Sequence, residues 1–207
     1  MQGGMIGTQA RQSLEHVLER AVRSRLVLQP GDTCTIDRVT IPAADSDGRV
    51  DGRVEGRIDG SVDGNDPVVA LTISAMGFRY MLFLRFRNDA ATAAYYARDN
   101  AGELRDTLLE LGNLCCGAIN QELVRHFPDL GMSTPYALGG HSLRHIDSLK
   151  PDYRADVCVA IADGVVIDAT TCLFTRVPID FHIDAGAEEA TSNATSNATS
   201  DGELELF

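Results

Sequence analysis

The hydrophobic positions of the chain follow two periods, one typical of helices and the other typical of strands. Over residues 9–28 apolar side chains recur near helical spacing, and Pro30-Gly31 follows as a stop, which predicts an amphipathic helix. Residues 33–41 alternate between apolar and polar side chains, which predicts a strand. The pattern therefore predicts a helix and then a strand at the start of the chain.

The middle of the chain is rich in β-branched and aromatic residues, as strands are. Residues 68–76 and 78–87 predict two strands with Gly77 as the bend between them. A short Ala/Tyr-rich helix is predicted over 90–98. A long helix is predicted over 100–126, where Asn100 is the expected N-cap, Glu103 follows three residues later, and Phe127-Pro128 ends the helix.

Strand patterns return after the long helix. They cover about 134–146, 157–162 and 165–174, and Asp163-Gly164 between the last two is a strong two-residue hairpin signal. Residues 177–183 predict a final strand. Together these elements predict an α/β (α+β) domain in which helices pack on a mostly antiparallel sheet.

Two segments lack apolar periodicity. Residues 43–66 contain a four-residue Asp-Gly-Arg-Val-type repeat, which predicts a flexible insertion, with a metal site and a partner-binding loop as alternatives. The repeat does not fit the spacing of an EF-hand. Residues 185–207 are Ala/Thr/Ser/Asn-rich and predict a disordered tail, whose final Leu-Glu-Leu-Phe is either a docking motif or a frayed end. One domain over 1–184 is expected.

Composition narrows the possible partners and compartments. Thirty acidic against eighteen basic residues give a net charge of −12, which disfavours nucleic-acid and membrane-surface binding. The five cysteines show no zinc-like spacing, so reduced, buried thiols are expected and no metal site is predicted. The start of the chain lacks a secretory pattern, which predicts a cytoplasmic protein.

The long helix carries a polar stripe that separates it from an ordinary core helix. At about 100° per residue, one side presents a carboxylate, a carboxamide and a glycine toward solvent. Glycine inside a helix costs about 1 kcal/mol relative to alanine, which favours a functional reason for its presence. A solvated polar face is the alternative. The stripe consists of Asp106, Glu110, Asn113, Gly117 and Asn120.

The spacing Asp106-xxx-Glu110-xx-Asn113-xxx-Gly117 resembles the signature of the CheC, CheX and FliY-type chemotaxis phosphatases. Further on, the segment from Asp129 through Ser-Thr-Pro135, followed by Gly-Gly-His141, resembles the loop and strand after this helix in CheX-like domains. The resemblance spans residues 8–184 and includes one copy of the motif, as in CheX. It implies a mostly antiparallel sheet with the motif-bearing helix packed on it.

The resemblance also implies an activity, which is hydrolysis of the aspartyl phosphate on a CheY-like response-regulator receiver domain. Asn113 would be the catalytic residue that positions water, and Glu110 would pair with the receiver's lysine. Asp106, Gly117 and Asn120 would contact the partner. The Mg²⁺ would belong to the receiver, so the protein needs no cofactor of its own.

Several alternatives stay open at this point. A non-catalytic module of the same fold would bind a receiver or a flagellar-switch component, and a structural dimerisation domain is a further possibility. The resemblance to CheX and the need to cover strand edges predict a homodimer. His141 and His145 are either a catalytic pair or ordinary histidines on a strand. Cys115 is expected in the core, and Cys116 is either buried or redox-sensitive.

Overall fold

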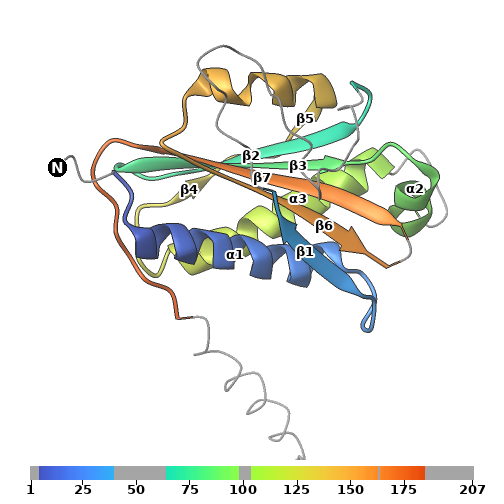
Figure 1. Cartoon of the computed structure of the whole chain (residues 1–207), viewed down its shortest axis with the longest axis horizontal. Helices are drawn as coiled ribbons and strands as arrows, with labels where there is room; N and C mark the ends of the chain where they lie inside the picture. The colour runs from blue at the N-terminus through green and yellow to red at the C-terminus, as the bar shows by residue number, and fades with distance from the viewer. Residues whose placement is uncertain (1–4, 40–63, 98–103, 163, 185–207) are drawn as a thin grey trace, which may run out of the picture.

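An antiparallel sheet of seven strands organises this protein, whose computed structural model describes residues 5–39, 64–97, 104–162 and 164–184 (Figure 1). The strand order is β1-β6-β7-β3-β2-β4, and β5 pairs with β2 beside β4. The strands are β1 (Cys34–Arg38), β2 (Pro67–Ser74), β3 (Phe78–Phe86), β4 (Gly131–Met132), β5 (Tyr136–Gly139), β6 (Tyr153–Ile161) and β7 (Val165–Thr175). The helices are α1 (Thr8–Leu26), α2 (Ala90–Tyr96), α3 (Leu104–Leu123) and the 3-10 helix η1 (Gly140–Leu149).

Two hairpins form the centre of the sheet. β2 and β3 pair in the register Leu71 to Leu82, with the Gly77 bend between them. β6 and β7 pair from Ile161 and Val165 outward, and Gly164 has a φ of +111°, the left-handed conformation that favours glycine. Both predicted hairpins are therefore confirmed, and all the strand pairs are antiparallel.

The main core lies between the sheet and the two long helices. α1 and α3 lie side by side against one face of the sheet, as Figure 1 shows. Helical spacing puts the apolar side chains of each on its sheet side, such as Leu18 of α1 and Ile119 of α3, while β2, β3 and β7 supply the opposite wall. The two helices predicted at 9–28 and 100–126 are confirmed, although α3 ends at Leu123 and its expected N-cap lies outside the described residues.

The opposite face of the sheet carries η1, which corrects one prediction. The strand expected over 134–146 is wrong beyond Gly139, because β5 ends there and residues 140–149 form the 3-10 helix. Leu143 and Ile146 are three residues apart, which matches the three-residue turn of a 3-10 helix. Both therefore face the sheet, where they pack with Val68 and Phe83 in a second, smaller cluster.

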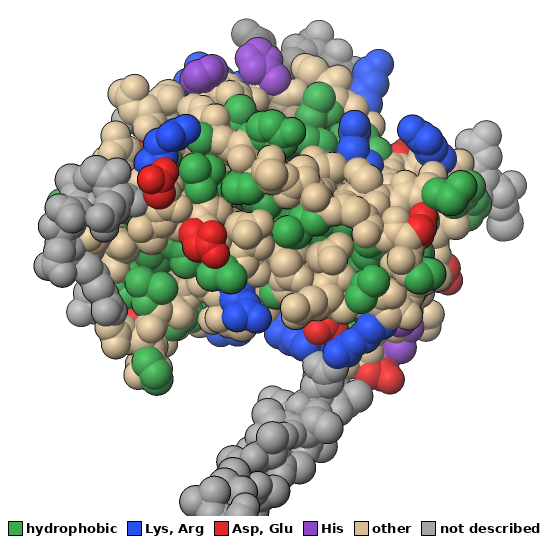
Figure 2. Space-filling model, turned by 180° about the vertical axis from the view of Figure 1, so that it is seen from behind, with side chains coloured by type: hydrophobic (Ala, Val, Ile, Leu, Met, Phe, Trp, Pro, Cys, Tyr) green, Lys and Arg blue, Asp and Glu red, His purple; other side chains and the backbone are tan. Residues whose placement is uncertain are grey.

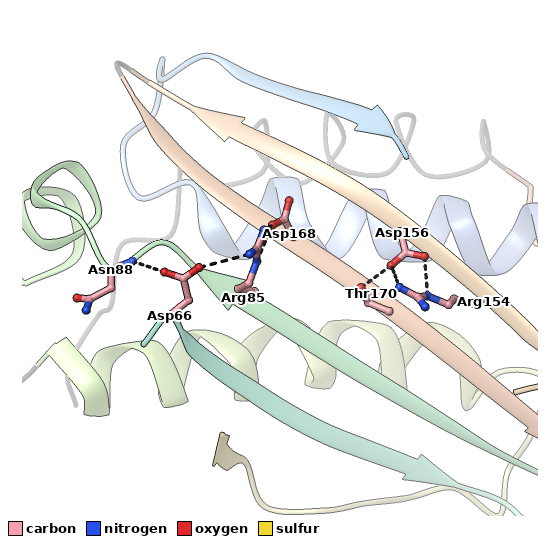
Figure 3. A network of polar contacts seen from close by, with 7 residues as sticks. All are labelled: Asp66, Arg85, Asn88, Arg154, Asp156, Asp168 and Thr170. Carbon is pink, nitrogen blue, oxygen red and sulfur yellow. Dashed lines mark hydrogen bonds and ion pairs between the residues drawn. The ribbon is translucent and has the colours of Figure 1, made fainter. Parts of the chain in front are cut away.

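A buried ion pair network lies in the sheet beneath this face (Figure 3). The Arg85 guanidinium donates to Asp168 through Nε at 2.8 Å and contacts Asp66 Oδ2 at 3.4 Å. Asp66 also accepts a hydrogen bond from the backbone N–H of Asn88 at 3.0 Å. Arg85 and Asp66 are both buried, so this network is part of the folded domain.

This network corrects the end of the predicted insertion. The insertion was expected over 43–66, yet Asp66 is buried and paired with Arg85. The described part resumes at Gly64, so residues 64–66 belong to the domain. The rest of the repeat over 40–63, like the tail over 185–207, lies outside the described residues.

The strand predicted over 177–183 is also wrong. Its only sheet-like contact in the described part is a single parallel bridge between Ile6 and Ile179. The alternating side chains instead pack beside the helices: the Phe181 ring meets Phe127 edge to face at 5.2 Å, and Ile183 donates its backbone N–H to Ser13 Oγ at 2.9 Å. The segment has the two-residue period of a strand because it is extended, but it contacts residues 5–7, α1 and Phe127 after α3 instead of joining the sheet.

Candidate functional site

The outer side of α3 carries the five residues that the sequence singled out. Asp106 and Glu110 are exposed, whereas Asn113 and Asn120 are half-buried. The opposite side of the helix is anchored in the core by Leu108, Leu111, Gly112, Cys115, Cys116, Ile119 and Leu123. Because the stripe is attached to a rigid, well-packed element, its side chains have defined positions relative to one another.

Glu110 and Asn113 lie one helical turn apart and are uncommitted within the described part of the chain. Neither side chain makes a hydrogen bond or an ion pair with any described residue. A carboxylate that accepts and a carboxamide that both donates and accepts are therefore available to a bound molecule. Half-burial of Asn113 restricts its rotamers, while Glu110 reaches further into solvent.

Gly117 and Asn120 continue the stripe in different ways. A Cβ added at Gly117 would meet no heavy atom within 4 Å, so the helix backbone is open to a close approach there. Asn120 lies at the inner margin of the stripe, and its Oδ1 is enclosed without a hydrogen-bond partner in the described structure. Asn120 is therefore less available to a partner than Asp106 or Glu110.

The loop after α3 is held against β2 and the turn that follows it by three hydrogen bonds. Ser133 exchanges two hydrogen bonds with Thr72, one through its backbone N–H at 2.8 Å and one accepted by its Oγ at 3.0 Å. Asp129 accepts from the backbone N–H of Met76 at 2.8 Å. These contacts give the Ser-Thr-Pro segment a structural role, since they fix β4 along the same sheet edge that α3 covers.

Two pairs of residues considered from the sequence do not join the site. Cys115 and Cys116 are both buried, and burial raises the pKa of each thiol to about 12, which leaves them protonated and unreactive near neutral pH. His141 and His145 are exposed on η1, on the far side of the sheet from α3. In the view from behind in Figure 2, histidines appear at the top, where Figure 1 places η1.

Two features beside the stripe escaped the sequence analysis. Leu114 is a leucine on the solvent side of α3 and is 41% exposed. A groove of about 200 Å³ separates α3 from α1. The helical wheel places Leu114 near Glu110, so its position was available from the sequence, but the groove depends on how two distant segments pack.

Neither metal ligands nor a membrane helix are found in the parts of the chain that the structure describes. No three or more His, Cys, Asp or Glu side chains there are grouped so that they could hold a metal ion. No helix there is both long and apolar enough to cross a membrane.

Comparison with solved structures identifies the fold, although neither a protein-family model nor a curated protein matches the sequence. A chain of the CheX–CheY–BeF3–Mg²⁺ complex from Borrelia burgdorferi is 12% identical with a TM-score of 0.50, over 79% of this chain and 97% of that chain. CheX from Vibrio vulnificus is 14% identical with a TM-score of 0.47, over 78% and 96%. A FliM middle domain from Vibrio alginolyticus is 9% identical with a TM-score of 0.43, over 80% and 92%.

The chain has the CheC/CheX-type fold, an antiparallel sheet with a long helix packed on it. The fold expected from the resemblance is thereby confirmed. At these identities the comparison concerns the fold alone.

Proposed function

We propose that this protein is a phosphatase that hydrolyses the aspartyl phosphate of a CheY-like receiver domain. One observation carries the proposal: Glu110 and Asn113 stand one turn apart on the solvent side of α3, uncommitted to any described residue, on a CheC/CheX-type fold. The structure of CheX with CheY, BeF3 and Mg²⁺ gives the proposal its partner class.

In this reaction water attacks the phosphorus atom, the bond to the receiver's aspartate breaks, and inorganic phosphate and a free carboxylate leave. The Asn113 carboxamide would donate to and accept from the water, which holds it in line with the breaking bond. Positioning of this kind lowers the barrier without a strong base. The phosphoryl charge would be neutralised by Mg²⁺ bound to the receiver, so this chain supplies no cofactor.

Glu110 would serve docking and alignment. Its carboxylate lies one turn from Asn113, and an ion pair with the receiver's active-site lysine would fix the angle at which α3 meets the phosphoryl group. Asp106 would contact the receiver at the edge of the interface. Gly117, whose Cα carries no side chain, would let the receiver surface approach the helix backbone. Asn120 would add a contact only at the inner margin of the stripe.

The test is phosphate release from a phosphorylated receiver with excess Asn113→Ala variant. Turnover should be lost while circular dichroism and receiver binding stay close to wild type. Asn88→Ala is the matched control, because it makes the same chemical change at an exposed position on the β3–α2 turn. Glu110→Ala should weaken binding and turnover together.

Wild-type turnover by Asn113→Ala would contradict the catalytic assignment. If the protein bound phosphorylated receivers yet released no phosphate from any of them, the non-catalytic binding module would be the correct alternative.

A further inference from the structure

The groove between α1 and α3 runs along one side of the candidate site. Its volume is about 200 Å³, and its lining includes the small apolar residues Ala21 of α1 and Ala118 of α3 among mostly polar ones. Gln121, which also lines the groove, lies one helical turn after Gly117, so the groove borders the stripe. The groove is lined by Val17, Arg20, Ala21, Ser24, Arg25, Ala118, Gln121 and Glu122.

An exposed apolar side chain stands next to this groove. Leu114 lies one turn before Ala118 on α3 and is 41% exposed. Together with Ala21 and Ala118 of the groove, it forms a surface that a partner's side chains can cover. Apolar residues at the centre of an interface commonly contribute much of its affinity.

Arg25 is the uncommitted cation at the rim of the groove. It is exposed and makes no hydrogen bond or ion pair with any described residue. Arg20, in contrast, bridges to Glu122 at 2.7 Å, and Arg23 faces the other way and donates to the Cys34 carbonyl at 2.8 Å.

Arg25 also lies near the turn of α3 that carries Leu114. Arg25 of α1 and Ala118 of α3 both line the groove, and Ala118 lies one helical turn after Leu114. The candidate site therefore has an acidic side chain in the stripe on α3, Glu110, and a cationic side chain beside the groove, Arg25.

We propose that the groove is the second half of the receiver-docking surface, where Arg25 pairs with a carboxylate of the receiver and Leu114 packs against its apolar surface. This inference rests on the proposed function. Mg²⁺ in proteins is usually held by one or two carboxylates together with phosphate oxygens and waters, so we expect the receiver's phosphorylation site to be acidic. Glu110 would pair with the receiver's lysine, and Arg25 would pair with a carboxylate elsewhere on the receiver. Because Glu110 and Arg25 lie at different places on this protein, both pairs form in a single orientation of the receiver.

The experiment measures affinity for a receiver activated with beryllofluoride and Mg²⁺, together with steady-state turnover. Arg25→Glu should weaken binding about tenfold or more and should raise KM, with kcat at saturation unchanged. Leu114→Ala should weaken binding about tenfold. Arg23→Glu is the matched control on the same helix and should change affinity by less than about twofold.

Binding by Arg25→Glu that equals binding by Arg23→Glu would overturn the proposal, provided that thermal melting shows both variants folded. The same result with Asn113→Ala inactive would leave the phosphatase function standing. Conversely, Arg25→Glu could bind the activated receiver more weakly than wild type while wild type releases no phosphate. This result would support the docking role of the groove and refute the phosphatase function. A wild-type protein that binds no activated receiver would refute both.

Discussion

The Cβ that Gly112 lacks would lie 2.5 Å from Cγ1 of Val69 and 3.2 Å from its Cβ. α3 therefore passes so close to β2 that only glycine fits at the crossing. Five residues later on the same helix, the corresponding position at Gly117 meets nothing within 4 Å. One glycine permits the packing that anchors the helix, and the other leaves the helix open on its solvent side.

Substituting each glycine by alanine should separate these roles. Gly112→Ala should lower the free energy of unfolding by about 1–3 kcal/mol, because Val69 is buried and β-branched and cannot move aside. Gly117→Ala should leave stability unchanged or raise it by up to about 1 kcal/mol through better helix propensity. Urea unfolding of both variants checks this, and equal stabilities would contradict the packing argument.

The buried network around Arg85 should contribute strongly to stability. Asp66→Ala removes one partner of Arg85 and the acceptor for the Asn88 N–H, which should cost about 1–3 kcal/mol. Arg85→Met leaves Asp66 and Asp168 facing each other without their cation and should cost about 3–5 kcal/mol. Denaturant titration is the measurement. A change no larger than that of the exposed control Asp184→Ala would show that the network is dispensable.

The Asp-Gly repeat is predicted to be dispensable when Asp66 is kept. β1 and β2 lie four strand positions apart, so the connection must span at least about 19 Å. Replacing residues 47–62 with a flexible Gly/Ser linker of about eight residues, and ending the chain at 184, should leave the Tm nearly unchanged. Extending the deletion through Asp66 should lower the Tm. Loss of cooperative melting in the shorter deletion would show that the repeat packs on the domain.

The cysteines should respond to pH as buried thiols do. Because burial raises the pKa of Cys115 and Cys116 to about 12 from 9, the folded chain keeps protons that the unfolded chain releases between those values. The free energy of unfolding should therefore fall as the pH rises from about 9 to 12. Iodoacetamide at pH 8 should leave both residues unmodified in native protein, as mass spectrometry of peptides would report. Rapid native labelling of either would contradict their burial.

A homodimer remains a prediction, and the structure indicates which edge to test. β5 is an edge strand with exposed Tyr136 and Leu138 and no charged residue, whereas the other edge, β1, carries Asp37 and Arg38. Uncovered apolar edges associate readily. Light scattering should give twice the 22.3 kDa chain mass, and Leu138→Lys should give a monomer. A monomeric wild-type protein at micromolar concentration would refute the prediction.

The sequence by itself determined the features that depend on near neighbours in the chain. Helical spacing was enough to locate α1 and α3 and to place Glu110 and Asn113 on one side of α3, since residues three and four apart share a helix face. The Asp-Gly pair was enough to predict the β6–β7 hairpin, because a glycine at positive φ closes a two-residue turn.

Only the tertiary structure decided the features whose partners are distant in sequence. The need for glycine at 112 comes from Val69, and the burial of Asp66 comes from Arg85. The extended segment at 177–183 packs beside α1 and residues 5–7 and does not join the sheet. The groove beside Arg25 exists because α1 and α3 pack together, although residues 27–103 lie between them in the chain. The local pattern of apolar residues specifies which side of a helix or strand is buried. Which other element covers that side depends on long-range packing, and the periodicity of the sequence does not encode it.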